Sequence, residues 1–140
     1  MKLVDANVLL YAVNSDARHH RDSRGWLDHA LSGNDTVGFS WVALLAFVRI
    51  SSRHGIFAYP LSVEDAMQQV SEWLAAPGAV VAHPGPAHAE HLARLLQHVG
   101  TGGNLVNDAH LAALALEHRA EIVSYDNDFA RFEGVRWRRP

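Results

Sequence analysis

The sequence contains no cysteine among its 140 residues. That absence excludes disulfides, zinc sites built from thiolates and thiol nucleophiles, and it fits a reducing compartment. No apolar run approaches the roughly 20 residues that a membrane-spanning helix needs. The first residues also lack the charged, apolar and cleavage-site segments of a secretory signal. We therefore expect a cytoplasmic protein with no membrane partner.

The chain also lacks an excess of basic residues. Its formal net charge is −3 and its pI is about 6.3, which argues against a broad, non-specific nucleic-acid binder. A nucleic-acid partner is still compatible with the sequence, because the basic residues are unevenly placed. They gather at Arg18, Arg21 and Arg24 with His19 and His20, at Arg49, Arg53 and His54, and at Arg136, Arg138 and Arg139. Each cluster fits phosphate contacts and fits an ordinary solvated face.

Short apolar runs alternate with segments of helical spacing along the whole chain. The runs predict strands over 2–5, 36–39, 79–82 and 121–124, with a fifth at an edge over 135–137. The spacing predicts helices from 7 to 11 or 12, 16 or 19 to 31, 41 to 52, 62 to 75, 86 to 98, and 107 or 108 to 118. The helix over 41–52 is apolar nearly all round, so we expect it to be buried. This alternation predicts one α/β domain over residues 1–140, with a short, mainly parallel sheet between helices and a glycine-rich loop over 99–104 near its site.

Carboxylates stand where such a fold collects its ligands. Asp5 and Asp126 each follow a buried strand, Asp128 comes two residues later, and Asp108 opens a helix. In open α/β folds, ligands bind just beyond the carboxyl ends of the strands. Several carboxylates sharing one pocket repel each other unless a cation neutralises them, and Mg²⁺ or Mn²⁺ suits an all-oxygen site. The pattern therefore indicates metal-assisted phosphodiester hydrolysis.

Each acid also has a simpler interpretation. Asp5 and Asp108 are typical caps of the helices that follow them, and Asp126 with Asp128 is typical of a turn. Asn7 and Ser124 could orient the carboxylates, although local capping explains them slightly better. The histidine spacing matches no zinc-binding motif, so most histidines are expected at the surface. The sequence also has no nucleophile elbow, P-loop or dinucleotide-binding glycine motif.

Three segments together resemble a known family. They are Val-Asp-Ala-Asn-Val-Leu-Leu-Tyr-Ala at 4–12, Asn-Asp-Ala-His-Leu-Ala-Ala-Leu-Ala at 107–115, and Ile-Val-Ser-Tyr-Asp-Asn-Asp-Phe-Ala-Arg-Phe at 122–132. In order and spacing they are similar to the PIN domain, and above all to the VapC toxins of type II toxin–antitoxin pairs. The resemblance covers nearly the whole chain.

The resemblance implies a PIN-like α/β/α sandwich and a Mg²⁺- or Mn²⁺-dependent endoribonuclease that stops translation by cutting tRNA or rRNA. It implies Asp5, Asp108 and Asp126 as catalytic metal ligands, with Asp128 as a further, less constant catalytic acid. It also implies a VapB-type antitoxin that blocks the site, and a homodimer. A DNA flap nuclease or exonuclease is a more distant alternative, because 140 residues leave no room for the helical inserts of those enzymes.

One position departs from the family pattern. The family usually has a glutamate in the helix after the second strand, and the register from Ser40 and Arg49 places that position at Ala46. No acid lies between Asp35 and Glu64. The remaining carboxylates suffice for one Mg²⁺ that keeps several waters, whereas a second metal would be weakly held. The alternative is therefore a catalytically weakened PIN-like module that mainly binds antitoxin or RNA.

Overall fold

The computed structural model describes residues 1–100, 103 and 105–140. Within these residues the chain forms a five-stranded sheet of order β3-β2-β1-β4-β5. Its strands are β1 (Lys2–Val4), β2 (Val37–Phe39), β3 (Ala79–Val81), β4 (Glu121–Val123) and β5 (Trp137–Arg138). The helices are α1 (Ala6–Val13), α2 (His20–His29), α3 (Trp41–Ser51), α4 (Val63–Ala75), α5 (His88–Val99) and α6 (Leu105–His118), with a π-helical turn η1 (Ala30–Asn34) and a 3₁₀ turn η2 (Asn127–Arg131).

All the strand pairs of this sheet are parallel. β1 lies at the centre, where Leu3 is in register with Gly38 of β2 on one side and Ile122 of β4 on the other. The chain moves outward from β1 through β2 to β3, returns to the other side of β1 as β4, and then adds β5. The strand order therefore reverses between β1 and β4, and in α/β folds the crevice at such a reversal is where ligands bind.

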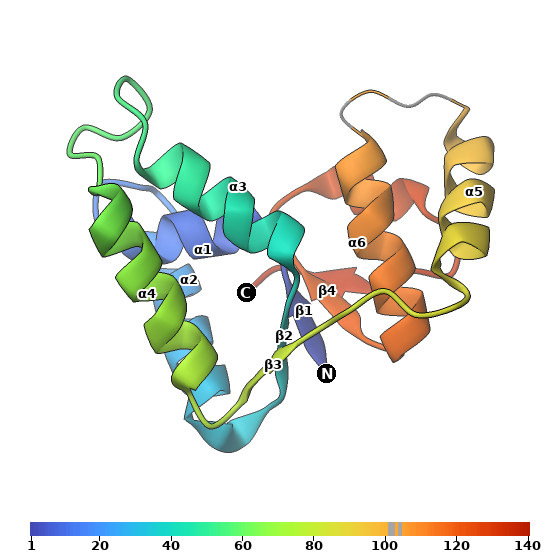
Figure 1. The fold of residues 1–140 in the computed structure, drawn as a ribbon, viewed down its shortest axis with the longest axis horizontal. Helices are drawn as coiled ribbons and strands as arrows, with labels where there is room; N and C mark the ends of the chain where they lie inside the picture. Colours follow the sequence, from blue (N-terminus) through green and yellow to red (C-terminus); the bar gives the residue numbers. More distant parts are fainter. Residues whose placement is uncertain (101–102, 104) are drawn as a thin grey trace.

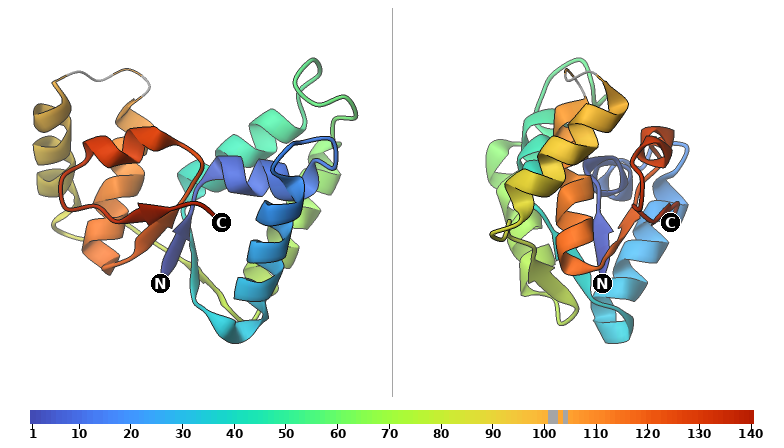
Figure 2. Two further views of the ribbon diagram at one scale, coloured as in Figure 1. Left: turned by 180° about the vertical axis from the view of Figure 1, so that it is seen from behind. Right: turned by 90° about the vertical axis from the view of Figure 1, so that its right-hand side faces the viewer.

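The sheet separates two apolar cores. Side chains alternate across a strand, so Leu3 and Ile122 face one core while Val4 and Val123 face the other. Helices α1, α2, α3 and α4 pack against the second of these faces, and α5 and α6 pack against the first. Figures 1 and 2 show α1–α4 together on one side of the sheet and α5 with α6 on the opposite side. The expected α/β/α sandwich with a parallel sheet is confirmed.

The local elements agree with the sequence in most places. The five strands are present, each within two residues of its expected bounds. Ser40 caps α3 as its hydroxyl accepts from the amide of Ala43, and Ser62 caps α4 by accepting from the amide of Asp65. These caps satisfy first-turn amides that no intrahelical carbonyl can reach.

Three expectations about helices were wrong. Asn7 does not cap α1, because Asp5 occupies that position and its carboxylate accepts from the amide of Ala6. Asp108 does not open a helix, since α6 already begins at Leu105. Helix α3 is not buried all round, because Trp41 is 43% exposed and Leu45 is 61% exposed. Of the glycine-rich loop, Gly100 ends α5 in a left-handed conformation, whereas Thr101, Gly102 and Asn104 lie outside the described residues.

Candidate active site

The carboxyl edge of the sheet brings the predicted acids together. Asp5 leaves β1 and caps α1, Asp126 follows β4 and caps η2, and Asp108 projects from the start of α6. Asp5 and Asp108 line the same small cavity. Asp126 and Asp128 act on Asp108 electrostatically, and so does Asp5. Four acids from distant parts of the sequence therefore share one site at the point where the strand order reverses.

The carboxylate of Asp5 is held by three hydrogen bonds. Oδ1 accepts from the amide nitrogen of Ala6 at 2.7 Å. Oδ2 accepts from Nδ2 of Asn7 at 2.9 Å and from the hydroxyl of Ser124 at 2.7 Å. Burial raises the pKa of Asp5, and these hydrogen bonds partly offset that rise by favouring the ionised form. The position of this carboxylate is consequently fixed from both β1 and β4.

Ser124 and Asn7 connect the two strands at this edge. The Ser124 hydroxyl, which is fully buried, donates to Asp5 and accepts from Nδ2 of Asn7 and from the amide of Asp126. The Asn7 side-chain oxygen accepts from the amide of Tyr125 at 3.2 Å. Ser124 thus makes the expected local turn bond, to the amide of Asp126, and also bonds Asp5 and Asn7 across the sheet. Asn7 does not cap α1, and its side chain orients the Asp5 carboxylate instead.

A second group of carboxylates lies beside Asp5. One oxygen atom from each of Asp108, Asp126 and Asp128 lies within 4.8 Å of the others. Burial, followed by the charges of Asp126, Asp5 and Asp128, raises the pKa of Asp108 to about 6. Such a cluster of like charges favours either a bound proton or a bound cation. The donors are all carboxylate oxygens, which suit Mg²⁺ or Mn²⁺ better than softer metals.

This cluster differs in one member from the predicted ligand set of Asp5, Asp108 and Asp126. Asp128 is present in it, and Asp5 is not. Three donors hold the Asp5 carboxylate against Ser124 and Asn7 and use three of its roughly four lone-pair sites, so one site on Oδ1 is left for a cation or its bound water. The described residues thus fit a divalent cation, with Asp5 on the wall of the pocket and the other three carboxylates converging.

Ala46 lies on that same wall. The cavity beside Asp5 and Asp108 has a volume of about 190 Å³ and is also lined by Ala46, Ser40 and Asn107. The register that placed Ala46 at the site is confirmed. Because Ala46 carries only a methyl group, α3 offers no carboxylate here, and the space that a longer acid would fill stays open.

Two arginines lie close to the site, which the sequence clusters alone did not reveal. Nη2 of Arg139 donates to the side-chain oxygen of Asn127 at 3.3 Å, between the two acids of η2. Arg49 lines a neighbouring cavity together with Ala46 and Asn107. Neither placement has a local sequence signal, because each depends on how α3 and β5 pack at the sheet edge.

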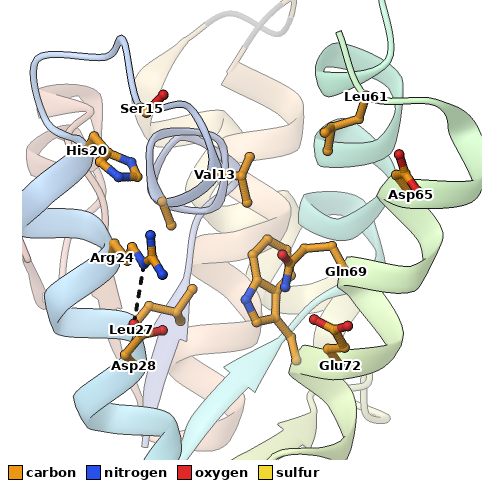
Figure 3. Close-up of a pocket in the computed structure, with 12 residues that line it drawn as sticks. Val13, Ser15, His20, Arg24, Leu27, Asp28, Leu61, Asp65, Gln69 and Glu72 are labelled. Carbon is orange, nitrogen blue, oxygen red and sulfur yellow. Dashed lines mark ion pairs between the residues drawn. The ribbon is translucent and has the colours of Figure 1, made fainter. Parts of the chain in front are cut away.

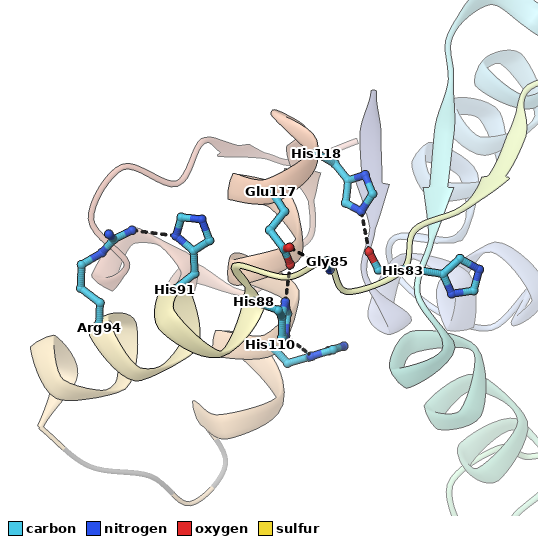
Figure 4. A network of polar contacts seen from close by, with 8 residues as sticks. All are labelled: His83, Gly85, His88, His91, Arg94, His110, Glu117 and His118. Atoms are coloured by element: carbon cyan, nitrogen blue, oxygen red, sulfur yellow. Dashed lines mark hydrogen bonds and ion pairs between the residues drawn. The ribbon is translucent and has the colours of Figure 1, made fainter.

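The histidines form a separate network away from the acids. His88 contacts Glu117 through Nδ1 and His110 through Nε2, at 2.5 Å and 2.9 Å. Figure 4 shows this network between α5 and α6, with His118 reaching the carbonyl of His83. Burial lowers the pKa of His110. His88 and His110 are exceptions to the expected surface placement, and their contacts hold α5 against α6.

A larger hollow lies on the other side of the sheet. It has a volume of about 560 Å³ and opens between α1, α2 and α4. Figure 3 shows charged and polar side chains of α2 and α4 facing each other across it, with an ion pair between Arg24 and Asp28. None of the four clustered acids lines it. The larger of these two cavities is therefore not the one that contains the clustered acids.

Comparison with known proteins gives the family. The sequence pattern of the PIN domain matches residues 2–135. Ribonuclease VapC37 of Mycobacterium tuberculosis is 66% identical over 140 residues, which is all of this chain and 97% of that protein. The chain belongs to the PIN-domain VapC ribonucleases. At this identity the resemblance read from the three motifs is confirmed.

Solved structures of low sequence identity share the fold. VapC20 of Mycobacterium tuberculosis, described as a sarcin–ricin loop cleaving toxin, superposes with a TM-score of 0.71 at 17% identity, over 97% of this chain and 99% of that one. A toxin–antitoxin complex from Klebsiella pneumoniae superposes with a TM-score of 0.63 at 19% identity, over 96% and 95% of the two chains. That second structure was determined as a complex of a toxin with its antitoxin. Among the described residues, no helix is both long and apolar enough to cross a membrane.

Proposed function

We propose that this VapC ribonuclease toxin is a metal-dependent endoribonuclease that cuts tRNA or rRNA loops and thereby stops translation. The observation that carries the proposal is the gathering of Asp108, Asp126 and Asp128 beside Asp5. Burial, followed by the charges of the neighbouring acids, raises the pKa of Asp108 to about 6, and a bound cation would relieve the repulsion among these charges. We assign Asp5, Asp108 and Asp126 as ligands of Mg²⁺ or Mn²⁺, with Asp128 in support.

The chain's own residues supply fixed geometry for hydrolysis. Ser124 and Asn7 keep the Asp5 carboxylate in one orientation. Asp126 orients the attacking water, which breaks one P–O bond in line and leaves phosphate on one fragment and hydroxyl on the other. When bound, the cation supplies stabilisation of the negative charge that develops on the phosphate. Arg139 and Arg49, at the rim, are placed to hold flanking phosphates.

The size of the pocket favours an RNA loop as the substrate. The cavity that Asp5 and Asp108 line has a volume of about 190 Å³, which suits a group the size of one backbone phosphate with a few waters. An unpaired loop can splay its backbone into such a space, whereas a paired segment cannot. Cleavage of the sarcin–ricin loop by VapC20 is one precedent for a loop substrate on this fold.

The test is an RNA cleavage assay with purified protein freed of antitoxin. Total tRNA and rRNA are incubated with Mg²⁺, with Mn²⁺ and with EDTA, beside Asp5→Asn and the matched control Asp16→Asn. Asp16 is exposed and lies outside the acid cluster. We expect discrete, metal-dependent fragments from wild type and Asp16→Asn, and none from Asp5→Asn, with circular dichroism showing all three folded. Cleavage by Asp5→Asn at the wild-type rate would refute the assignment.

Ala46 supports a second candidate function, that of a weakened module that binds antitoxin or RNA. Its methyl group stands on the wall where a further carboxylate would meet Asp5 and Asp108. Ala46→Glu separates the two functions, with Gln68→Glu as the control, since Gln68 is exposed on α4 and lines neither cavity beside the acids. A folded wild type that gives no fragments, together with a large gain in Ala46→Glu alone, would favour the weakened module. Equal cleavage by wild type and Ala46→Glu would favour the nuclease.

We also propose two protein partners. A VapB-type antitoxin would occupy the hollow between α1, α2 and α4, which offers apolar walls at Leu61 and Trp73 and charges on both sides. The antitoxin complexes of homologues support this partner. A second copy of the chain would cover the exposed apolar side of α3, where Trp41 and Leu45 lie. Co-purification with the product of the adjacent reading frame, compared between wild type and Leu61→Lys, tests the first contact.

A further inference from the structure

Three aromatic rings pack together where α1, the start of α2 and the segment after β4 meet. Tyr11 belongs to α1, His19 precedes α2, and Tyr125 lies between Ser124 and Asp126. His19 stacks on Tyr125 with centroids 4.1 Å apart and an interplanar angle of 18°. Tyr11 lies 5.3 Å from Tyr125 and 5.4 Å from His19. We call these three residues the aromatic cluster.

The distances show which ring face is left open. Tyr11 is almost equally far from His19 and Tyr125. A ring on the outer face of His19 would be much farther from Tyr125 than from His19. Tyr11 therefore lies beside the two-ring stack and leaves the outer face of the His19 ring uncovered by the cluster. All three residues are partly exposed, whereas the core rings Phe39 and Phe47 are fully buried.

Polar contacts hold the aromatic cluster in place. The buried hydroxyl of Ser23 donates to the Tyr125 hydroxyl at 3.1 Å. Nδ1 of His20 contacts the carbonyl of Tyr11 at 2.8 Å, which ties the start of α2 to α1. The amide of Tyr125 donates to Asn7, which also bonds Asp5. The same hydrogen bonds thus position the stack and the carboxylates, so a ligand stacked on His19 has a defined place relative to the acids.

The surroundings favour a nucleic-acid ligand. Arg18 and Arg21 flank His19 and His20 in sequence, and both arginines are exposed, as are Asp16 and Asp22 at the ends of this segment. Aromatic faces bordered by arginines are the recurring means of binding single-stranded nucleic acid, because every base has a flat π face and every nucleotide a phosphate.

We propose that the aromatic cluster is a stacking subsite for an unpaired nucleobase next to the scissile phosphate, with His19 as the ring that the base contacts. This inference rests on the proposed ribonuclease function and adds how the substrate is positioned. It explains why only a flexible RNA segment would be cut: one base must leave its own stack to continue the His19–Tyr125 stack.

The experiment measures binding without cleavage. The probe is a single-stranded oligoribonucleotide carrying 2-aminopurine, whose fluorescence is quenched on stacking, titrated in EDTA with wild type, His19→Ala and His19→Trp. The control is His29→Ala, since His29 is exposed at the opposite end of α2. We expect quenching by wild type, affinity weakened about five- to tenfold in His19→Ala, and affinity kept or increased in His19→Trp. His29→Ala should behave as wild type.

Kinetics complete the test where the protein cleaves RNA. Loss of a stacking contact made equally in ground and transition state raises KM and leaves kcat nearly unchanged. Equal binding by His19→Ala, His19→Trp and wild type would overturn the subsite, even if cleavage is observed. Conversely, quenching that depends on residue 19 in a protein that cuts no RNA would keep the subsite and refute the proposed nuclease.

Discussion

At the scale of single residues, the Ser124 side chain links three other residues of the site. One hydroxyl donates to Asp5 and accepts from both Asn7 and the amide of Asp126, so it uses its full hydrogen-bonding capacity in the buried edge of the sheet. Asp108 has no comparable set of partners among the described residues, and burial with neighbouring charges raises its pKa to about 6. The negative charges of the two acids that line the pocket are thus stabilised in different ways. Hydrogen-bond donors stabilise the charge of Asp5, whereas Asp108 needs a bound proton or cation.

Asp108 gives a prediction about stability and pH. Its pKa is raised in the folded state from 3.8 to about 6, so between these values the folded protein binds more protons than the unfolded chain. Stability of the metal-free protein must therefore fall as pH rises from about 4 to about 6. Asp108→Asn cannot ionise and avoids this loss. We expect the free energy of unfolding of Asp108→Asn to exceed that of wild type by about 1 kcal/mol at pH 7.5, after discounting for solvent screening of a half-buried group.

Thermal melts in EDTA measure this difference. Asp108→Asn should melt about 3 °C above wild type at pH 7.5 and close to it at pH 4, while Asp16→Asn should follow wild type at both. Mg²⁺ should raise the melting temperature of wild type more than that of Asp108→Asn, because a cation bound only by the folded state stabilises it. If the difference in melting temperature between Asp108→Asn and wild type does not change across this pH range, the ionisation of Asp108 is not its cause.

The sequence predicted the members of the acid cluster but not their roles toward one another. Asp5 and Asp126 could be found because an acid after a buried strand is unusual for packing alone. The bond from Ser124 to Asp5 joins residues from opposite ends of the sequence, and no local pattern encodes such a contact. The position of Ala46 was found by register, whereas the placement of Arg139 beside Asn127 required the packing of β5.

At the scale of elements, Gly78 fixes the connection between α4 and β3. Its amide donates to the carbonyl of Leu31, and its carbonyl accepts from Val37. A Cβ at this position would lie 2.8 Å from the backbone oxygens of Ala30 and Asp35. Backbone atoms cannot turn aside as a side chain can, so the turn η1 and the start of β2 need glycine here.

Gly78→Ala and Gly25→Ala should therefore act in opposite directions. Gly78→Ala should lower the free energy of unfolding by about 2 kcal/mol, because the added Cβ overlaps with backbone atoms. Gly25 lies inside α2, where an added Cβ would meet nothing within 4 Å, so Gly25→Ala should gain about 1 kcal/mol through helix propensity. Urea denaturation reports both shifts as changes in the midpoint. A Gly78→Ala variant as stable as wild type would contradict this account of the turn.

Elements were more predictable where local chemistry decides them than where packing does. Ser40 and Ser62 cap their helices by rules that act within four residues. The start of α6 was placed too late, because the sequence signal for a helix start was taken from the acid at Asp108 rather than from the apolar residues before it. The exposure of α3 was missed for a different reason: its apolar residues lie on all sides, and only the finished fold leaves Trp41 and Leu45 uncovered.

At the scale of the whole molecule, that uncovered side of α3 predicts self-association. Leu45 is 61% exposed and Trp41 is 43% exposed, and a second copy would remove both from water. Leu45→Lys should convert a dimer into a monomer, because a charge cannot be buried there without a partner. Met67→Lys, on α4, is the control for an exposed apolar residue elsewhere. Size-exclusion chromatography with light scattering measures the mass, and a Leu45→Lys dimer would exclude this interface.

The order of the strands also bears on when the molecule becomes active. β1 must pair with β4 before Asp5 can meet Ser124 and Asp126, yet a ribosome translates almost the whole chain between these two strands. A nascent chain therefore holds Asp5 without its partners until β4 has emerged and inserted beside β1. The repulsion among the acids arises only at that last docking step. The parallel pairing of β1 with β4 therefore means that the acid cluster can assemble only after residues 121–128 have been synthesised.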